Sequence, residues 1–370
     1  MAELTKDLVL QALSTVNDPD LNKPLTELGM IANVVVCSGV VSFEIKLTTT
    51  ACPLKQKIMD DATVAVQALE GVSQVNATFS KETVTLQSSV KDRERIPGVQ
   101  NIIAISSGKG GVGKSTVTVN LACALAQEGA RVGILDADIY GPNVPLMMGL
   151  MVPEKGVING VKGQTQDGKM VPPKAHGVKV MSMAFLIKPE QPVVWRGPLL
   201  DKVIRDFMAK TDWAPLDYLL IDLPPGTGDA QLTIVQAAPL AGAIIVTTPQ
   251  EVALHDSRKG YAMFKSTNIP VFGIVENMSY YLLPDGTRDY IFGQGGGERA
   301  ATELGVDYLG GIPLVTKLRQ ESDVGRPIMI ADPDGPHASI IRQIAHTVIA
   351  KVCAAGIAEQ AAPQPAMATV

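Results

Sequence analysis

A glycine-rich loop with two lysines contains the residues whose types and spacing could do chemistry in this chain. Its sequence, Gly-Lys-Gly-Gly-Val-Gly-Lys-Ser-Thr, satisfies the pattern G-x-x-x-x-G-K-[ST]. In such a loop backbone N–H groups turn toward phosphates, the last lysine (Lys114) reaches the β and γ oxygens, and the Ser115 hydroxyl faces Mg²⁺. The pattern therefore predicts a site for ATP and Mg²⁺, formed by Gly108, Lys109, Gly110, Gly111, Val112, Gly113, Lys114, Ser115 and Thr116.

Lys109, near the front of this loop, is one lysine more than a simple phosphate loop needs. It cannot reach its own γ-phosphate as well as Lys114 does. We therefore expect it to cross a dimer interface and neutralise phosphate charge on the facing subunit. A charge supplied in trans makes hydrolysis conditional on assembly, as an arginine finger does. The loop thus favours an ATPase that dimerises, with Lys109 and Lys114 as catalytic residues.

Carboxylates stand at the ends of two apolar stretches downstream of the loop. Leu219–Ile221 leads into Asp222, which suits a carboxylate bound to Mg²⁺ through water. Another stretch ends in Asp136-Ala137-Asp138, where one carboxylate can lie near the metal while the other orients the attacking water. After Asp222 comes a glycine-punctuated loop suited to sensing a γ-phosphate. Its expected switch residues are Pro225, Gly226, Thr227, Gly228 and Asp229.

Seven short apolar runs predict the strands that position these groups. The runs lack polar–apolar alternation, which is typical of strands buried on both faces. We therefore expect an α/β fold, in which the mostly parallel sheet of a P-loop NTPase is flanked by helices and preceded by a small α+β domain. The runs are Ile102–Ile105, Val132–Leu135, Val178–Met181, Tyr218–Ile221, Ala243–Thr247, Val271–Val275 and Leu309–Ile312.

Residues 1–90 have a different pattern, which predicts the small α+β domain. Helical and strand-like segments are Thr5–Thr15, Ile31–Val36, Val40–Leu47, Pro53–Ala68, Val72–Phe79 and Thr83–Leu86. A charged stretch that ends in Pro-Gly, residues 91–98, is expected to be a linker to a P-loop ATPase domain at 99–353. Residues 354–370 are low in complexity and are expected to form a frayed tail.

Composition argues against several functional classes. A net charge of −5 argues against a broad nucleic-acid interface. No apolar run approaches the ~20 residues that span a bilayer, and the first residues lack a signal-peptide pattern. We therefore expect a cytoplasmic protein without nucleic-acid or membrane partners. The four cysteines show no C-x-x-C spacing, which argues against a disulfide framework.

Several longer motifs accompany the phosphate loop. They are Asp136–Asn143, Asp222–Asp229, Thr247–Gln250, Glu276–Ser279 and Ile291–Gly297. With them the chain resembles the deviant Walker A class that includes MinD, ParA and the iron proteins, and within it the Mrp/ApbC group of iron–sulfur cluster carrier ATPases. The N-terminal part resembles the SufT-like domain often fused to bacterial Mrp proteins, through Asp18–Asp20, Glu27–Met30 and Thr48–Pro53.

This resemblance implies roles for residues singled out above. The implied assignments are Asp138 for the hydrolytic water, Asp136 and Asp222 for Mg²⁺ beside Ser115, Lys109 for action in trans, and Asn277 with the backbone around Pro313 for adenine. It also implies ATP, Mg²⁺ and an iron–sulfur cluster as cofactors. The implied assembly is a homodimer whose partners are iron–sulfur assembly proteins or apo-client proteins.

The chain departs from this group at the cluster ligands. In the Mrp group, Glu-Asn-Met-Ser is usually followed by C-P-x-C, and two such loops give a dimer four thiolates for one cluster. Here the following loop, Ser279–Thr287, contains Pro284 but no cysteine, and no cysteine occurs from residue 124 to 352. The bridging cluster of that group cannot form with those ligands.

Cys52 is the remaining thiol with a functional interpretation. It matches the cysteine of the T-x-A-C-P pattern and stands where a strand gives way to a helix, a place that favours a thiolate. A buried structural cysteine is the alternative. One thiol per subunit cannot hold a cluster alone, so the other ligands would come from a partner or a glutathione-like thiol.

Two other functions stay open for a chain without the cysteine pair. One is an ATP-dependent adaptor that holds no cluster, and the other is a partition or positioning ATPase of the MinD/ParA type. The second would need a basic amphipathic helix or a basic DNA-binding patch. The nearly uncharged tail argues against it.

Overall fold

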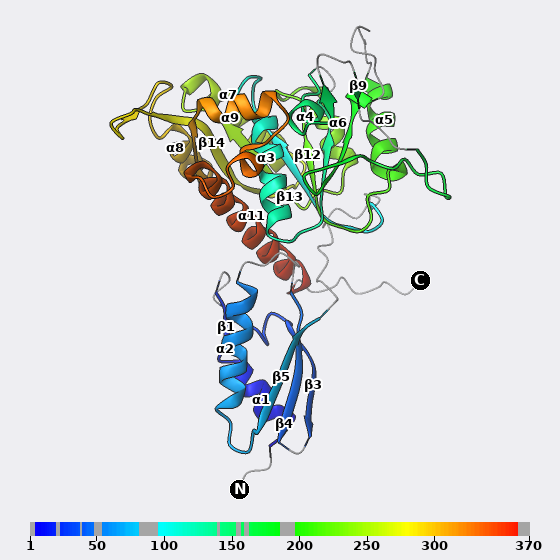
Figure 1. The fold of residues 1–370 in the computed structure, drawn as a ribbon, viewed down its shortest axis with the longest axis vertical. Coiled ribbons are helices and arrows are strands. Elements are labelled where there is room, and N and C mark those ends of the chain that lie inside the picture. Colours follow the sequence, from blue (N-terminus) through cyan, green and yellow to red (C-terminus); the bar gives the residue numbers. More distant parts are fainter. Residues whose placement is uncertain are drawn as a thin grey trace. The chain divides into compact units, whose positions relative to one another are not determined.

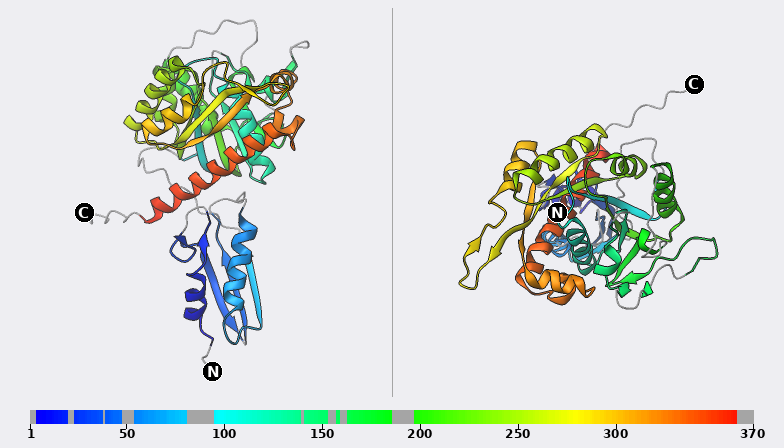
Figure 2. Two further views of the ribbon diagram at one scale, coloured as in Figure 1. Left: turned by 90° about the vertical axis from the view of Figure 1, so that its left-hand side faces the viewer. Right: turned by 90° about the horizontal axis from the view of Figure 1, so that it is seen from above.

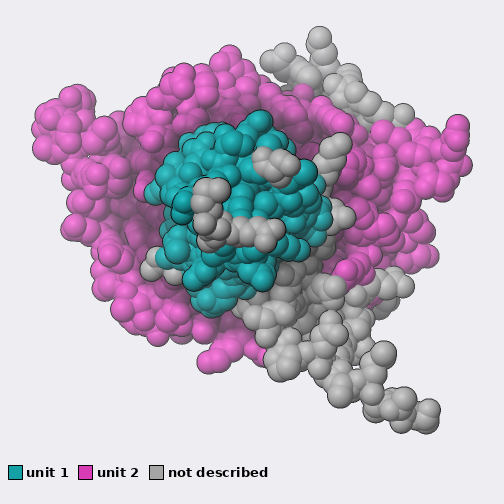
Figure 3. Space-filling view, turned by 90° about the horizontal axis from the view of Figure 1, so that it is seen from below, with its two compact units in different colours: residues 1–87, 349–370 teal, residues 88–348 magenta. Residues whose placement is uncertain are grey.

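The computed structural model describes residues 4–19, 23–37, 39–47, 54–80, 95–138, 141–152, 157–158, 163–185 and 197–361. The chain divides into two compact units, residues 1–87 with 349–370 and residues 88–348, which are coloured separately in Figure 3. Each unit is described by itself below. Within the described part of the chain, no helix is both long and apolar enough to cross a membrane.

In the described part of residues 4–80, the smaller unit contains a three-stranded sheet and two helices (Figure 1). Strand β4 (Val40–Ile45) lies between β3 (Ile31–Cys37), which is antiparallel to it, and β5 (Gln74–Phe79), which is parallel to it. Helix α1 (Lys6–Leu13) begins after Thr5, whose hydroxyl accepts a hydrogen bond from the Leu8 N–H. Two-residue strands β1 (Asn17–Asp18) and β2 (Lys23–Pro24) pair with each other.

The apolar residues of these elements form a core of their own. Val9 and Leu13 of α1 pack with Ile58 and Val66 of α2 (Lys55–Gln67) and with Phe43 of β4, and all five side chains are buried. Burial of the apolar stripe of each helix against one sheet face is what holds a unit of this size together. The predicted α+β character is therefore confirmed. The predicted strand Thr83–Leu86 lies outside the described residues.

The larger unit is built on a nine-stranded sheet in the described residues, with the order β10-β11-β7-β12-β6-β13-β14-β15 and with β16 also paired to β14. Its strands are β6 (Val99–Ser106), β7 (Val132–Asp136), β10 (Lys174–Ala175), β11 (Val178–Ser182), β12 (Leu216–Asp222), β13 (Gly242–Thr247), β14 (Val271–Leu282), β15 (Arg288–Asp289) and β16 (Tyr308–Leu314). All neighbours are parallel except at the two ends, where β10 and β15 are antiparallel to their partners. Every residue of β7, β12 and β13 is buried, as their continuous apolar runs predict.

Helices cover both faces of this sheet (Figure 2). On one face α3 (Lys114–Gln127), α4 (Val144–Met147), α9 (Thr316–Asp323) and α10 (Ile328–Ala331) contact one another. Elsewhere α5 (Gly197–Lys210) packs on α6 (Asp229–Ala237), and α7 (Glu251–Ser266) packs on α8 (Gly296–Leu304). Two-residue strands β8 (Met151–Val152) and β9 (Val157–Ile158) pair apart from the main sheet, and the short helix η1 (Met183–Phe185) follows β11. The expected doubly covered, mostly parallel sheet is confirmed.

Two segments differ from the sequence-based expectation. The strand expected at Val271–Val275 continues to Leu282 and returns through β15 as a hairpin. Helix α11 (Pro336–Ala361) continues past Ala354, so the expected frayed tail is wrong as far as Ala361, and 362–370 lie outside the described residues. The alanines of this stretch are strong helix formers, so a sequence of low complexity here is still helical.

Candidate nucleotide site

The phosphate loop joins β6 to α3 and depends on glycine at its last turn. Gly111 and Gly113 have φ values of +80° and +82°, a left-handed conformation that glycine adopts without steric cost. A Cβ atom on Gly113 would lie 2.1 Å from Nδ2 of Asn277, whereas one on Gly111 would meet nothing within 4 Å. Gly113 is therefore required both by its backbone conformation and by the close approach of β14.

Asp222, at the end of β12, is the centre of the site. Its carboxylate is fully buried and accepts hydrogen bonds from Lys114 Nζ at 2.7 Å and Ser115 Oγ at 2.6 Å. A third donor is Thr118 Oγ1, at 2.6 Å from the other carboxylate oxygen. A buried carboxylate is tolerated only when it is paired and hydrogen-bonded in this way. The structure thus brings together the predicted lysine, hydroxyl and carboxylate.

Thr118 is a partner that the sequence argument missed. It lies one helical turn after Lys114, to whose carbonyl oxygen its hydroxyl also donates, at 3.0 Å. The i, i+4 spacing of Lys114 and Thr118 places both on one side of α3, and this was the available signal. The helix face that follows the phosphate loop therefore fixes Asp222 from two directions.

Asp136 and Asp138 lie at different depths. Asp136 is fully buried at the end of β7, where it pairs in register with Asp222, and it accepts a hydrogen bond from Ser182 Oγ at 2.9 Å. Burial, followed by the nearby charge of Asp222, raises the pKa of Asp136 well above its ordinary value. Asp138 instead lines the cavity of the loop, and its Oδ2 lies 3.8 Å from Lys114 Nζ. Of the two, Asp138 is the one that faces the cavity.

A cavity of about 180 Å³ follows the phosphate loop. It is lined by Ser107, Lys109, Gly110, Gly111, Val112, Gly113, Lys114, Ser115, Thr116, Asp138, Asn143, Met147 and Pro225. Backbone N–H groups at the start of α3 together with the Lys114 ammonium favour an anion here. The lining combines this anion cradle with the Ser115 hydroxyl and Asp138, which suits a phosphate chain with Mg²⁺.

Lys109 and the switch residues border the same cavity. Among the described residues, no ion-pair partner approaches the Lys109 ammonium, and its carbonyl accepts from Ser107 Oγ at 3.0 Å. The Gly226 N–H donates to the Ser107 carbonyl at 3.0 Å, which ties the switch loop to the phosphate loop. Pro225 lines the cavity, whereas Thr227, Gly228 and Asp229 are exposed at the start of α6.

The two residues expected at adenine lie on neighbouring strands. Asn277 pairs with Ile312 in the β14–β16 register, and Pro313 is the next residue along β16. The Asn277 side chain is 5% exposed and its Nδ2 donates to the Val112 carbonyl at 2.8 Å. Neither residue lines the phosphate cavity. In this structure Asn277 holds the phosphate loop, a role that its type alone did not reveal.

The segment in place of the cysteine motif is a tight hairpin turn. The Leu283 N–H donates to the Thr287 carbonyl and the Gly286 N–H to the Leu283 carbonyl, both at 2.9 Å. With Pro284 matched to the proline of C-P-x-C, the two cysteine positions are Leu283 and Gly286. Gly286 has φ +85°, a conformation that a cysteine rarely adopts. The hairpin therefore lacks the thiols, and at Gly286 it has a backbone conformation that disfavours a cysteine.

Metal-binding side chains are otherwise sparse. Cys52 lies outside the described residues. Across the described ranges, no three His, Cys, Asp or Glu side chains are arranged to hold a metal ion by themselves. A Mg²⁺ ion in the phosphate cavity would thus need ligands beyond carboxylates, and Ser115 and phosphate oxygens are of the hard type that it prefers.

Comparison with known proteins relates both units to iron–sulfur proteins. Residues 98–349 match the family described as NUBPL iron-transfer P-loop NTPase, and residues 6–79 match the family described as iron-sulfur cluster assembly protein. The chain is 51% identical over 356 residues to an iron-sulfur cluster carrier protein of Synechocystis, covering 96% of this chain and 99% of that one. It is 39% identical over 352 residues to an iron-sulfur cluster carrier protein of Escherichia coli, covering 95% and 93%.

A solved structure with a similar fold is a nucleotide-binding protein from Archaeoglobus fulgidus in complex with ADP. It is 41% identical to this chain, with a TM-score of 0.56, and the match covers 65% of this chain and 91% of that one.

Proposed function

Because the chain belongs to the NUBPL iron-transfer P-loop NTPase family, we propose that it is an ATP-hydrolysing iron–sulfur cluster carrier or assembly factor that works as a nucleotide-gated homodimer. One observation carries the nucleotide part of this proposal. Lys114, Ser115 and Asp222 form one hydrogen-bonded cluster beside Asp138, at the cavity of a complete phosphate loop. A protein that only used this fold as a scaffold would not need that buried arrangement.

Each polar group of the cluster then has a step to perform. Lys114 would exchange its contact with Asp222 for the β and γ phosphates, and Ser115 would bind Mg²⁺ with Asp222 and Asp136 behind it. Mg²⁺ would neutralise charge on the transferred phosphoryl group. Asp138, which faces the cavity, would orient the attacking water. Lys109 would enter the site of the facing subunit.

Opening and closing would follow from the switch loop. Its Gly226 N–H is bonded to the Ser107 carbonyl at the base of the phosphate loop. Loss of the γ-phosphate when ATP is hydrolysed in the cavity can therefore be transmitted to Pro225 and to the start of α6. ATP would close the dimer, and hydrolysis would open it so that cargo is accepted or released.

The cluster itself would be cargo, exchanged with assembly proteins or apo-client proteins. Since the hairpin offers no thiol, Cys52 in the smaller unit is the ligand that we propose, completed by thiols from a partner or a glutathione-like compound. This part is supported by the relationship of residues 6–79 to iron–sulfur assembly proteins and by the softness of thiolate ligands.

Anaerobic reconstitution tests the cargo. The full chain is loaded with iron and sulfide in the presence of glutathione, beside Cys52→Ala and the control Cys37→Ala, which removes an exposed thiol of the same unit. We expect stoichiometric iron and sulfide in the native chain and in Cys37→Ala, and a loss of both in Cys52→Ala.

A specific observation favours the adaptor as a second candidate. The hairpin that replaces the cysteine loop is a closed turn without ligands. If no iron binds to any of the three proteins while ATP is still hydrolysed, cluster carriage is excluded and the adaptor function is the one that remains.

A further inference from the structure

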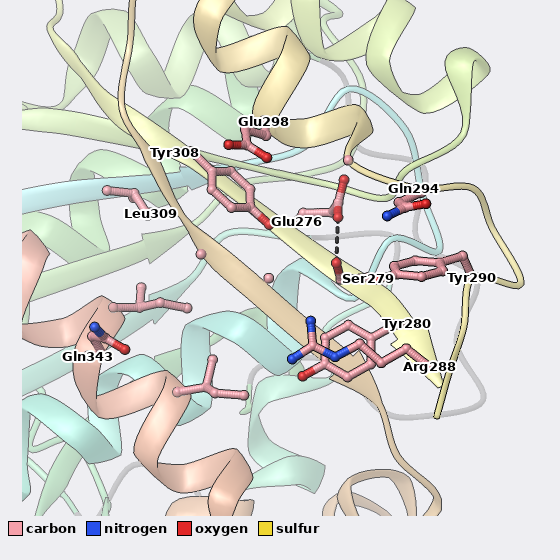
Figure 4. Close-up of a pocket in the computed structure, with 15 residues that line it drawn as sticks. Glu276, Ser279, Tyr280, Arg288, Tyr290, Gln294, Glu298, Tyr308, Leu309 and Gln343 are labelled. Atoms are coloured by element: carbon pink, nitrogen blue, oxygen red, sulfur yellow. Dashed lines mark hydrogen bonds between the residues drawn. The ribbon is translucent and has the colours of Figure 1, made fainter. Parts of the chain in front are cut away.

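A second cavity, of about 420 Å³, lies against β14 and is separate from the cavity of the phosphate loop. It is bounded by β14, β16, the start of α8 and the first part of α11 (Figure 4). Ile340 and Ile344 of α11 are among its lining residues. This volume is within the range of small-molecule sites. None of its lining residues belongs to the nucleotide cavity.

One wall of this cavity is aromatic and already carries a cation. The guanidinium carbon of Arg288 lies 4.2 Å from the centre of the Tyr280 ring, and the rings of Tyr280 and Tyr290 meet edge to face at 6.4 Å. The face of a tyrosine ring attracts a guanidinium or ammonium group electrostatically. Among the described residues, no carboxylate lies within ion-pair distance of Arg288, and its guanidinium contacts the ring of Tyr280 instead.

The floor and the opposite rim are acidic. Glu276 is 1% exposed and accepts hydrogen bonds from Ser279 Oγ at 2.5 Å and from the Gly297 N–H at 2.6 Å. Glu298 lies across Glu276 from Tyr280 and is exposed, and no cation pairs with it in the described part of the chain (Figure 4). Burial, followed by the charge of Glu276, raises the pKa of Tyr308, so this ring stays neutral beside them.

We propose that this cavity binds a small organic cation with guanidinium or primary ammonium groups, one of which takes the place of Arg288 over Tyr280 while another pairs with Glu298. The contact between Arg288 and Tyr280 is the chain's own example of the interaction. The ring of Tyr280 and the carboxylate of Glu298 lie on opposite sides of the buried Glu276 (Figure 4). An extended molecule with a cationic group at each end could therefore contact both.

The position of the cavity couples it to the nucleotide site. Glu276 faces the cavity, and the next residue, Asn277, donates to the Val112 carbonyl of the phosphate loop. Met278 follows with φ +55°, so the strand is irregular where the two sites meet. A ligand that shifts Glu276 would thus be sensed at the phosphate loop, and the cation becomes a regulator of nucleotide binding.

Calorimetric titration of the full chain with agmatine at low salt tests the site. Agmatine carries a guanidinium at one end and an amine at the other, and no iron is needed, so the result is independent of the cluster proposal. We expect saturable binding that weakens roughly threefold in Glu298→Gln, as for an exposed ion pair. Asp289→Asn, an exposed carboxylate of the same hairpin that does not line the cavity, is the matched control and should bind like the native chain.

The variant Arg288→Gln should change agmatine affinity in the opposite direction from Glu298→Gln. Removal of the competing guanidinium should strengthen agmatine binding, and succinate should not bind to either protein. A short peptide with a central arginine distinguishes the source of the cation, because tighter binding than agmatine indicates a segment of a partner protein. The proposal is overturned if neither agmatine nor the peptide saturates, or if Arg288→Gln abolishes binding.

Discussion

Two buried carboxylates of strand β12, Asp222 and Asp217, differ in the groups that neutralise them. Asp222 receives three side-chain donors and belongs to the nucleotide site, whereas Asp217, also fully buried, is neutralised by Arg131 through contacts of 2.6 and 3.0 Å. The hydrogen bond to Asp217 raises the pKa of Arg131, so this guanidinium stays protonated. Asp217 is near the start of its strand, whereas Asp222 is at the end, where the strand meets Lys114 and Ser115 of the phosphate loop.

Lys109→Ala should keep ATP binding but reduce hydrolysis at least tenfold, because a trans cation stabilises only the transition state. Binding is measured with a fluorescent ATP analogue and turnover by phosphate release, with Lys265→Ala, an exposed lysine of α7, as the control.

Mixing two inactive proteins separates action in trans from action in cis. A site with its own Asp138 and the partner's Lys109 is complete in a mixed dimer of Lys109→Ala and Asp138→Ala. About a quarter of native turnover should return at equal concentrations if lysine acts across the interface. No recovery, or unchanged turnover in Lys109→Ala, would rule out the trans role.

The cysteines should differ sharply in reactivity. Burial raises the pKa of the Cys123 thiol to about 12, so at pH 8 it is protonated and inaccessible, whereas Cys37 is exposed. Iodoacetamide followed by peptide mass spectrometry should label Cys37 and leave Cys123 unmodified until urea unfolds the chain. Labelling of Cys123 in the native protein at the rate of Cys37 would show that α3 opens far more readily than its packing indicates.

At the scale of elements, the phosphate loop is held by a strand far away in the sequence. Strand β14 brings Asn277 onto Val112 and leaves no room for a side chain at Gly113. The same strand then forms the wall of the second cavity and continues into the hairpin. β14 is thus the element through which these three regions can influence one another.

A double-mutant cycle measures this contact. Gly111→Ala and Gly113→Ala introduce the same left-handed alanine strain, about 1–2 kcal/mol, but only the second also meets Asn277. We expect Gly113→Ala to lower the free energy of unfolding further than Gly111→Ala does. Asn277→Ala should relieve that excess, giving a coupling of about 0.5–3 kcal/mol.

The free energies of unfolding are measured with urea for the native chain, the three single variants and the double variant Gly113→Ala with Asn277→Ala. Additive effects of Gly113→Ala and Asn277→Ala would mean that the close approach of β14 does not constrain the loop.

At the scale of the whole molecule, each of the two units has a cluster of buried apolar residues of its own in the described part of the chain. One contains buried residues from Val9 to Val66, and the other from Ile96 to Ala301, with no residue in common. All residues that line the nucleotide cavity belong to the larger unit.

Calorimetry of the full chain should therefore show two unfolding transitions. Mg-ADP at about one hundred times its Kd adds roughly 2.7 kcal/mol to the free energy of unfolding of the unit that binds it. The transition of the larger unit, which contains the nucleotide cavity, should therefore rise in Tm by several degrees. The other transition should not move. A single transition, or an equal shift of both, would show that the cores unfold as one cooperative unit.

The sequence by itself determined what depends on contiguous residues. The phosphate loop, the carboxylates that end apolar strands and the buried parallel sheet were predictable, because each is encoded within a short segment whose period or pattern is local. The absence of cysteines from residue 124 to 352 was equally plain, and it constrains the cargo more than any distance does.

Only the tertiary structure decided which distant residues complete the sites. Ser182 is bonded to Asp136 across 46 positions and Asn277 to Val112 across 165, and no local pattern encodes such pairs. The extension of β14 into a hairpin depends on pairing with β15, and the cavity over Glu276 exists because α8 and α11 meet β14 and β16 there. Packing between elements, which follows from burying their apolar faces together, fixes these neighbours after the local patterns have fixed the elements.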